Sequence, residues 1–279
     1  MTKRTATGTT VLFGAAILAA LTAGCYVSIN VDEANQIPAA RGKLEGSCER
    51  VYETAVPLEE QRLVSLTIVD GQIDVESWDR PELRVTATKT VRAETDQQAE
   101  KICRAIEIDV AETEDGVQIV TTMPRESSKN SRISVSFLLL VPPATDLELA
   151  TTNGSIAVRE VVGRHDIAAV NGSAQLTDVG GDVEVATVNG NICTVFQYID
   201  LSRDDITLES VNGEIIVELT EDASVKIDAT AANGSISSAF DLIDEEFDKT
   251  YGHTRLRGHL GEGEGTLEIS VTNGSIHIE

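Results

Sequence analysis

Four cysteines and four histidines are the residues of this 279-residue chain whose side chains could most readily act as nucleophiles, acid–base groups or metal ligands. The histidines are scattered, and none stands in a metal-binding spacing such as HExxH. The sequence contains neither the GxSxG motif of many hydrolases nor a CxxC pair. We therefore expect no catalytic residues, no cofactor and no metal site. Two histidines share an acidic stretch, where a solvated position is the ordinary expectation; the four are His165, His253, His259 and His277.

Cys25 is the one residue whose type a specific chemistry would require. Lys3 and Arg4 precede an apolar run from 11 to 21, which is shorter than the roughly 20 residues of a spanning helix. The following Thr22-Ala23-Gly24-Cys25 is similar to the bacterial lipobox, although Thr22 stands where leucine is usual. This pattern predicts a signal peptide over 1–24, cleaved before a lipidated Cys25.

A lipidated Cys25 predicts attachment to a membrane of the cell envelope. Several acyl chains on one residue give stable anchoring. Residue 26 is tyrosine rather than the aspartate that often retains lipoproteins at an inner membrane. In a cell with two membranes we therefore expect the outer one. Residues 25–60 are mixed and polar, and we interpret them as the lipidated cysteine and a tether.

The remaining cysteines, Cys48, Cys103 and Cys193, leave two interpretations open. In an oxidising compartment one pair could bridge and leave one thiol free. Alternatively, all three are free buried thiols. Their spacing selects no pair.

The net charge of −24 excludes nucleic acid as a partner, because such binding requires a basic surface. Loss of Lys3 and Arg4 with the signal would make the chain still more negative. Aromatic residues are 4% of the chain, which is sparse for a platform that stacks sugars. The 41% of hydrophobic residues is enough to build a core.

The residue pattern over 61–143 predicts a region of β-strands with one helix. Alternating residues flank Asp70-Gly71, and further strand patterns cover 84–91, 117–122 and 133–141. Residues 94–108 instead place apolar side chains at helical spacing, with Thr95 and Gln98 fitting a capping box. Pro142-Pro143 marks the end of this region.

Residues 144–279 contain a repeat marked by Asn-Gly pairs, and 61–279 is expected to be one continuous domain. The successive spacings are 18, 18, 23, 21 and 40 residues, and an apolar residue usually follows two positions after the glycine. Asp70-Gly71 resembles a degenerate seventh copy. The six pairs are Asn153-Gly154, Asn171-Gly172, Asn189-Gly190, Asn212-Gly213, Asn233-Gly234 and Asn273-Gly274.

This repeat predicts an all-β fold of the β-solenoid type, with the Asn-Gly pairs as tight turns. Glycine and asparagine tolerate the positive φ that such turns need. One unit is too small to bury its apolar side, so the units must stack. A row of antiparallel hairpins is the alternative plan. Residues 240–265 interrupt the period, and we expect them to leave the stack as a solvated, mobile loop.

Four local features invite a functional interpretation, and each has a simpler structural one. The Asn-Gly pairs could present an asparagine ladder to a ligand, or their amides could satisfy one another. Gly180-Gly181-Asp182-Val183 matches part of a calcium-binding repeat but occurs once, which favours a plain turn. Trp78 is expected to pack rather than bind. Carbohydrate-cleaving β-helices share the solenoid, but no carboxylate cluster recurs at one position of the repeat.

The repeated TxNGxI unit, the turn over 77–81 and the glycine-rich stretch at 261–265 together resemble one family. It is the bacterial β-strand-repeat family of uncharacterised domains, usually labelled as adhesins. The resemblance covers roughly residues 60–279 and implies the repeat architecture, with no catalytic residues to transfer.

The combined expectation is a non-enzymatic envelope lipoprotein whose β-repeat acts as an adhesin-like or scaffold interaction surface. Its candidate partners are the membrane, through the lipid, and a surface glycan or envelope protein. A periplasm-facing stress or sensory module that binds a partner protein is the alternative. A polysaccharide-cleaving enzyme is the third hypothesis.

Overall fold

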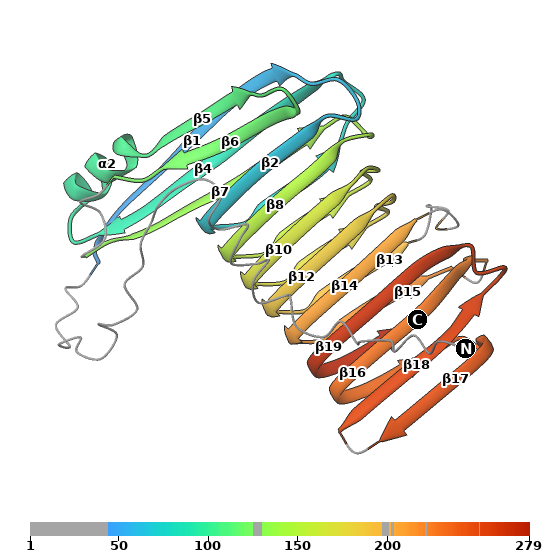
Figure 1. The fold of residues 1–279 in the computed structure, drawn as a ribbon. Helices are drawn as coiled ribbons and strands as arrows, with labels where there is room; N and C mark the ends of the chain where they lie inside the picture. The colour runs from blue at the N-terminus through green and yellow to red at the C-terminus, as the bar shows by residue number, and fades with distance from the viewer. Residues whose placement is uncertain (1–43, 125–129, 197–200, 202–203, 221, 251) are drawn as a thin grey trace, which may run out of the picture. The chain divides into compact units, whose positions relative to one another are not determined.

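Pairs of short strands joined at Asn-Gly corners form the rungs of a β-solenoid (Figure 1). The computed structural model describes residues 44–124, 130–196, 201, 204–220, 222–250 and 252–279. They fall within one unit, Arg41–Glu279. The predicted signal peptide and Cys25 lie outside the described residues.

The four central rungs each contain one longer and one shorter strand. His165 stands opposite both Leu147 and Val183, and all pairings between these rungs are parallel. This register confirms the solenoid and excludes a row of antiparallel hairpins here. The rungs are β8 (Asp146–Asn153) with β9 (Ile156–Arg159), β10 (His165–Asn171) with β11 (Ala174–Thr177), β12 (Val183–Asn189) with β13 (Ile192–Phe196), and β14 (Asp205–Asn212) with β15 (Ile215–Leu219).

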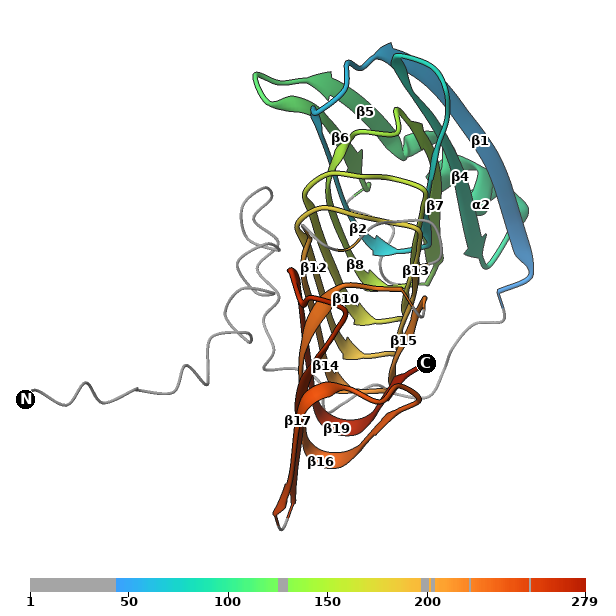
Figure 2. The ribbon, with the colours of Figure 1, turned by 90° about the vertical axis from the view of Figure 1, so that its right-hand side faces the viewer.

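The strands build two layers that face each other across the core (Figure 2). We call them the long-strand layer, which contains β8, β10, β12 and β14, and the short-strand layer, which contains β9, β11, β13 and β15. Alternate side chains point into the core, as period-two patterning requires. Leu147, Leu149, Ile156 and Val158 of the first of these rungs are at most 1% exposed.

The last strand of the chain lies inside the stack rather than at its end. Strand β19 (Gly265–Ile278) pairs in parallel with β14 and β15 on one side and with β16 (Val225–Ser238) on the other. Both β16 and β19 continue through their Asn-Gly pair and contribute to both layers. The spatial order of the rungs therefore departs from the sequence order.

The prediction that residues 240–265 leave the stack as a loop is wrong. They contain β17 (Ile243–Thr250) and β18 (His253–Leu260), an antiparallel hairpin that extends the long-strand layer beyond β16. Thr254, Leu256 and Leu260 are buried, whereas every residue of β17 is exposed. The charged residues between the apolar ones face solvent, and their abundance concealed the alternation.

At the other end, a rung of β2 (Leu63–Asp70) and β3 (Ile73–Ser77) stacks in parallel on β8 and β9. The next pair is β6 (Gly116–Thr122) and β7 (Arg132–Val141), again parallel to β2 and β3. Asp70-Gly71 thus occupies the corner of a rung, as its resemblance to the repeat predicts.

Antiparallel strands complete this end. Strand β4 (Glu82–Ala93) pairs with β7, β1 (Gly46–Pro57) pairs with β4, and β5 (Glu107–Glu112) pairs with β6. Residues 46–57 fall inside the stretch interpreted as a tether, so that interpretation fails from Gly46 onward. From Val51 onward, exposed residues alternate with half-buried ones, which suits an edge strand rather than a linker.

Helix α2 (Asp96–Ala105) packs against β1 and β4 and confirms the predicted helix. Thr95 is its N-cap, and the Thr95 hydroxyl accepts a hydrogen bond from the Gln98 amide. Ala99, Ile102 and Cys103 form the buried side of the helix.

Candidate functional site

The outward side of the long-strand layer carries three parallel columns of side chains, which we call the outer face. On β8, β10 and β12 the register places carboxylates in the first column, alanines in the second, and a threonine followed by valines in the third, whereas β14 places Thr207 and Glu209 in the first two columns. Their members are Glu148, Asp166 and Glu184, then Ala150, Ala168 and Ala186, then Thr152, Val170 and Val188. Neighbouring rungs lie about 4.8 Å apart, so each column presents one chemical group at regular intervals.

The alanine column makes the middle of the outer face a narrow, closely packed strip. Ala150 and Ala186 are only 8% and 6% exposed although they point outward. Glu148, Asp166 and Glu184 are exposed beside this strip.

Negative charge continues toward β16 but is partly neutralised there. Asp228 receives hydrogen bonds from Arg255 at 2.9 Å and from Arg257 at 3.3 Å, both on β18. Among the described residues, no ion pair reaches Glu148, Asp166 or Glu184. The uncompensated charge of the outer face therefore lies on the central rungs.

Glu209 shows the electrostatic consequence of this arrangement. Its pKa is raised, first because it is half-buried and then because of the neighbouring charges of Glu184 and Glu268. Crowded carboxylates on a flat sheet favour a positively charged group placed against them.

The Asn-Gly corners form a continuous ladder of side-chain amides. Each asparagine donates its Nδ2–H to the side-chain oxygen of the next rung, at distances from 2.8 to 3.1 Å. All six donations run in one direction and end on the carboxylate of Asp70. In order of donation the ladder is Asn233, Asn273, Asn212, Asn189, Asn171, Asn153 and Asp70.

This ladder favours the structural interpretation of the asparagines. Each amide between the two ends both donates to and accepts from a neighbouring rung. Aligned hydrogen bonds of this kind polarise one another, and a charged acceptor at the end strengthens the last bond. The sequence pointed to the asparagines and to Asp70, but the single direction follows from the stacking order.

In four of the six Asn-Gly corners, the glycine is required by close contact rather than by a left-handed backbone. At Gly190, a Cβ atom would lie 1.9 Å from the carbonyl oxygen of Gly172, and at Gly172 it would lie 1.8 Å from that of Gly154. The φ angles of Gly172, Gly190, Gly213 and Gly234 lie outside the left-handed region. The positive-φ argument from the sequence is therefore wrong for these four pairs.

The four histidines occupy separate environments. His165 is buried in the core, where its Nε2 lies 3.1 Å from the Val161 carbonyl and burial lowers its pKa. His277 contacts Glu214 at 2.9 Å and Ser237 at 2.8 Å. His259 bonds to the Gly261 carbonyl, and His253 is exposed. Within the described ranges, no three His, Cys, Asp or Glu side chains gather as a metal site would require.

Trp78 and the Gly180-Gly181 stretch both have structural surroundings. The Trp78 indole donates to the Glu82 carbonyl at 2.8 Å, and the guanidinium groups of Arg80 and Arg84 cover its ring. Gly180 forms a parallel bridge with Val162 at the turn between rungs. These contacts support packing for Trp78 and a plain turn at Gly180.

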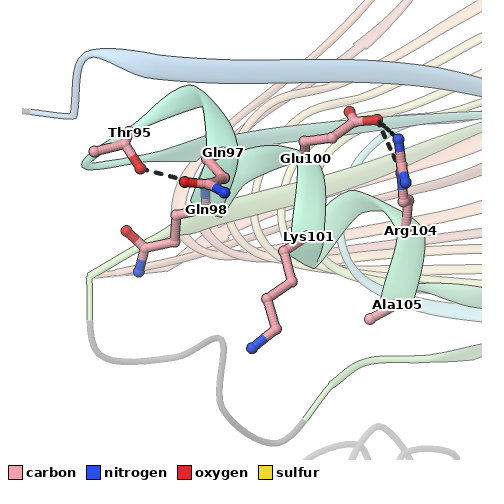
Figure 3. Close-up of a pocket in the computed structure, with 7 residues that line it drawn as sticks. All are labelled: Thr95, Gln97, Gln98, Glu100, Lys101, Arg104 and Ala105. Atoms are coloured by element: carbon pink, nitrogen blue, oxygen red, sulfur yellow. Dashed lines mark hydrogen bonds and ion pairs between the residues drawn. The ribbon is translucent and has the colours of Figure 1, made fainter.

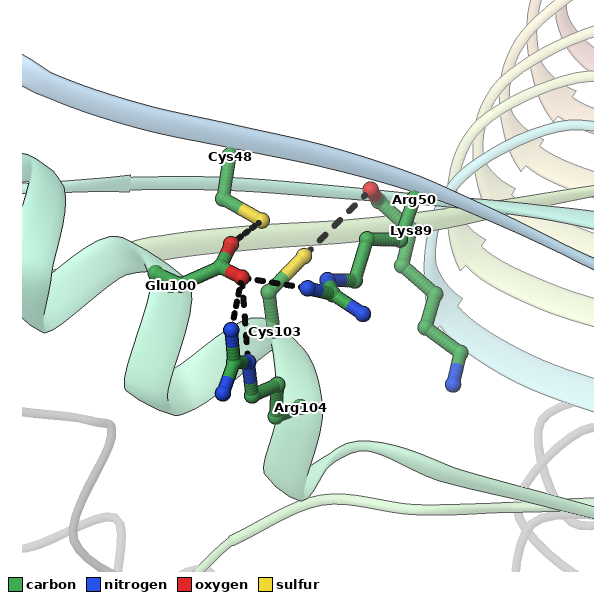
Figure 4. Close-up of polar contacts among 6 residues, drawn as sticks. All are labelled: Cys48, Arg50, Lys89, Glu100, Cys103 and Arg104. Atoms are coloured by element: carbon green, nitrogen blue, oxygen red, sulfur yellow. Dashed lines mark hydrogen bonds and ion pairs between the residues drawn. The ribbon is translucent and has the colours of Figure 1, made fainter.

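A polar cluster between β1 and α2 was not predicted from the sequence (Figure 4). The Glu100 carboxylate accepts from Arg50, from Arg104 and from the Cys48 thiol, whose sulfur is 2.9 Å away. The hydrogen bond from Arg50, followed by that from Cys48, lowers the pKa of Glu100 to about 2. Arg104 lies one helical turn from Glu100, but Cys48 and Arg50 are 52 and 50 residues away from it, so no local spacing could reveal those two partners.

The exposed side of α2 carries a shallow hollow next to this cluster (Figure 3). Apart from the Glu100–Arg104 pair, its side chains point to solvent without converging on a common point. Its lining residues all belong to α2 and its N-cap: Thr95, Gln97, Gln98, Glu100, Lys101, Arg104 and Ala105. This arrangement offers no enclosed binding pocket.

In the part of the chain that the structure describes, no helix is long and apolar enough to cross a membrane.

Comparison with known families identifies the fold. The model of the Toastrack DUF4097 family matches residues 27–279. The chain belongs to this family. The Toastrack match thus covers the whole described unit and confirms the family resemblance seen in the repeats.

Solved structures similar to this Toastrack chain include two that are named for a role in adhesion. A proposed cell adhesion protein from Clostridium sporogenes is 13% identical, with a TM-score of 0.43, and the match covers 82% of this chain and 99% of that one. A proposed adhesin from Bacteroides fragilis is 10% identical, with a TM-score of 0.37, covering 82% and 97%. No curated protein matches the chain.

Proposed function

We propose that this protein is a non-enzymatic, lipid-anchored envelope protein that binds a basic partner through the outer face of its solenoid. The observation that carries the proposal is the register of the central rungs. On the three neighbouring strands β8, β10 and β12 it repeats a carboxylate, an alanine and a threonine or valine.

The outer face has the physical properties of a recognition surface. Its strands are held in register by parallel backbone pairing and by the amide ladder at one corner. Side chains displayed on such a rigid layer lose little further freedom on binding. The carboxylates of Glu148, Asp166 and Glu184, which no ion pair reaches among the described residues, supply charge complementarity.

The anchor belongs to the same proposal. Lipidation of Cys25 would tether the domain to a membrane, while the strongly negative chain disfavours contact with anionic lipid headgroups. The outer face would then remain available to an envelope protein or to a molecule outside the cell. An adhesin-like role requires the second of these orientations.

Orientation is tested with an epitope inserted in the turn between β17 and β18, where Thr250 and His253 are exposed. Intact cells are treated with protease, with a known periplasmic protein as control. Loss of the epitope without lysis supports the adhesin-like role. Protection until the outer membrane is opened supports an envelope partner instead.

Cys25→Ser should abolish incorporation of labelled palmitate, and retained labelling contradicts the anchor.

Binding is tested with a photo-crosslinking amino acid at position 168, in the centre of the outer face. We expect crosslinked products in intact cells that disappear in the triple variant Glu148→Lys, Asp166→Lys, Glu184→Lys. The matched control reverses three exposed acids of β5, Glu107, Asp109 and Glu112. Equal loss of crosslinked products in both variants would contradict recognition by the outer face.

Metal-dependent cleavage of polysaccharides by the purified protein would contradict the non-enzymatic assignment.

A further inference from the structure

The start of β1 is pressed against α2, which brings two cysteines into one interface. The Ser47 amide donates to the Asp96 carboxylate at 3.0 Å. A Cβ atom at Gly46 would lie 2.0 Å from the Thr95 carbonyl carbon. Cys48, two residues later on the same side of β1, is 8% exposed.

Cys103 reaches the same interface from the helix. It is fully buried, and its sulfur lies 3.8 Å from the Lys89 carbonyl of β4. Lys89 stands opposite Arg50, and Val91 stands opposite Cys48, so both cysteines flank the same short part of the β1–β4 ladder. Both sulfurs lie in the layer between β1 and α2 (Figure 4), and the neighbouring Cys103 thiol contributes to the raised pKa of Cys48.

Cys193 lies far from this interface. It is on β13, and five strand-to-strand steps separate β13 from β4 in the short-strand layer. At about 4.8 Å a step this is roughly 24 Å, whereas bridged cysteines have Cα atoms less than about 7 Å apart. The fold therefore excludes a disulfide between Cys193 and either Cys48 or Cys103.

We propose that Cys48 and Cys103 form a disulfide that joins β1 to α2 in an oxidising compartment, leaving Cys193 as a free thiol. The occurrence of the bridge in the cell depends on the export proposed above. The pairing itself depends only on the fold.

The bridge forms by thiol–disulfide exchange with a small disulfide or an oxidoreductase disulfide. The thiolate of one cysteine attacks the oxidant, which releases one thiol and leaves a mixed disulfide. The second cysteine then attacks the protein sulfur of this mixed disulfide and releases the second thiol. Two protein thiols are oxidised, one oxidant disulfide is reduced, and the two protons pass to the released thiolates.

Burial limits when this exchange can occur. Burial, followed by contacts with Cys103 and Glu100, raises the pKa of Cys48 to about 12, so its reactive thiolate is scarce in the folded protein. We therefore expect the bridge to form during folding, before α2 closes over β1, and to be protected afterwards.

The position of the bridge gives it a mechanical consequence. β1 is the first described strand, it lies at the edge of the short-strand layer, and the chain enters it from the side of Cys25. Force applied through a lipid anchor would therefore peel β1 from β4, beginning at Gly46. A bridge at Cys48 transfers that force to α2 near the start of the strand.

The test uses the full chain, unfolded with reductant and refolded in a mixture of reduced and oxidised glutathione. Thiols are then alkylated in denaturant, and unreduced peptides are analysed by mass spectrometry. We expect a peptide pair linked through Cys48 and Cys103, two hydrogens lighter than the separate peptides, with Cys193 alkylated. Cys48→Ser and Cys103→Ser should each abolish it, and Cys193→Ser should not.

Alkylation of both Cys48 and Cys103, or a bridge that includes Cys193, would overturn the pairing. The same analysis on protein taken directly from cells separates this outcome from failure of the proposed function. A bridge after refolding but free thiols in the cellular protein upholds the pairing and contradicts export. Palmitate-labelled protein that stays unbridged even after refolding upholds the anchor and overturns the pairing.

Discussion

Replacing Gly190 with alanine tests whether the Asn-Gly corners need glycine for room or for an unusual backbone angle. The new Cβ would lie 1.9 Å from the Gly172 carbonyl oxygen, and real contacts of this kind are not shorter than 3.0 Å. The two rungs must therefore separate by about 1 Å at this corner.

The cost follows from the hydrogen bonds that such a separation removes. Across this corner the Gly172 amide donates to the Asn189 carbonyl at 3.2 Å, the Ala174 amide donates to the Asn191 carbonyl at 3.0 Å, and the Asn189 side chain donates to Asn171 at 3.0 Å. Each lost bond costs about 0.5–1.5 kcal/mol. Alanine restores roughly 0.4–1 kcal/mol by restricting the unfolded chain. With the central value of about 1 kcal/mol for each of the three bonds, the net loss of unfolding free energy is about 2–3 kcal/mol.

Gly252→Ala is the matched comparison, because Gly252 has the opposite properties. Its φ is +77°, but its added Cβ would meet no atom closer than 3.8 Å. A left-handed alanine costs roughly 1–2 kcal/mol, partly offset by the same restriction of the unfolded chain. Urea unfolding followed by circular dichroism should place Gly190→Ala well below Gly252→Ala in stability. An equal or reversed order would refute the argument from close contact.

Two further predictions concern the core and the ladder. His165 occupies the inward column between Leu147 and Val183, and its lowered pKa means that the unfolded chain binds a proton more readily than the native one. Stability should therefore fall as pH drops below about 6.5, the ordinary histidine value. His165→Leu should reduce this loss between pH 7 and pH 5 in urea titrations, while His253→Gln at the exposed start of β18 is the control and should keep the loss. An unaltered slope in His165→Leu would contradict the assignment. Asn189→Ala should cost about 1–2 kcal/mol, because it removes two ladder bonds of 2.9 and 3.0 Å. Val188→Ala on the outer face is its control, and equal thermal midpoints for the two variants would show that the ladder contributes nothing.

The stacking order could not be predicted from the repeat pattern. The segments around Asn233 and Asn273 are both Asn-Gly-Ser-Ile, so either could follow the rung of Asn212. The structure places Asn273 there and moves Asn233 outward, because β18 must pair antiparallel with β16 on its free side. A rung in the middle of the stack has both neighbours parallel and leaves no edge for that hairpin.

The outer face could not be predicted from the sequence either. Glu148, Asp166 and Glu184 are separated by 18 residues, and each alone is an ordinary exposed carboxylate. They become a column only because parallel pairing with an 18-residue period puts each on the next strand. The contact of Cys48 with Cys103 likewise depends on how α2 packs across β1 and β4.

By itself, the sequence determined the local elements and the repeating unit. Period-two alternation specified the strands of the rungs, helical spacing with the Thr95 cap specified α2, and the recurring Asn-Gly pairs marked the corners, including the variant at Asp70-Gly71. Only the tertiary structure decided the order of the rungs, the hairpin of β17 and β18, the direction of the amide ladder and the meeting of Cys48 and Cys103 at one interface. These features arise from contacts between residues far apart in the chain, and each depends on which edge or surface the rest of the fold leaves open.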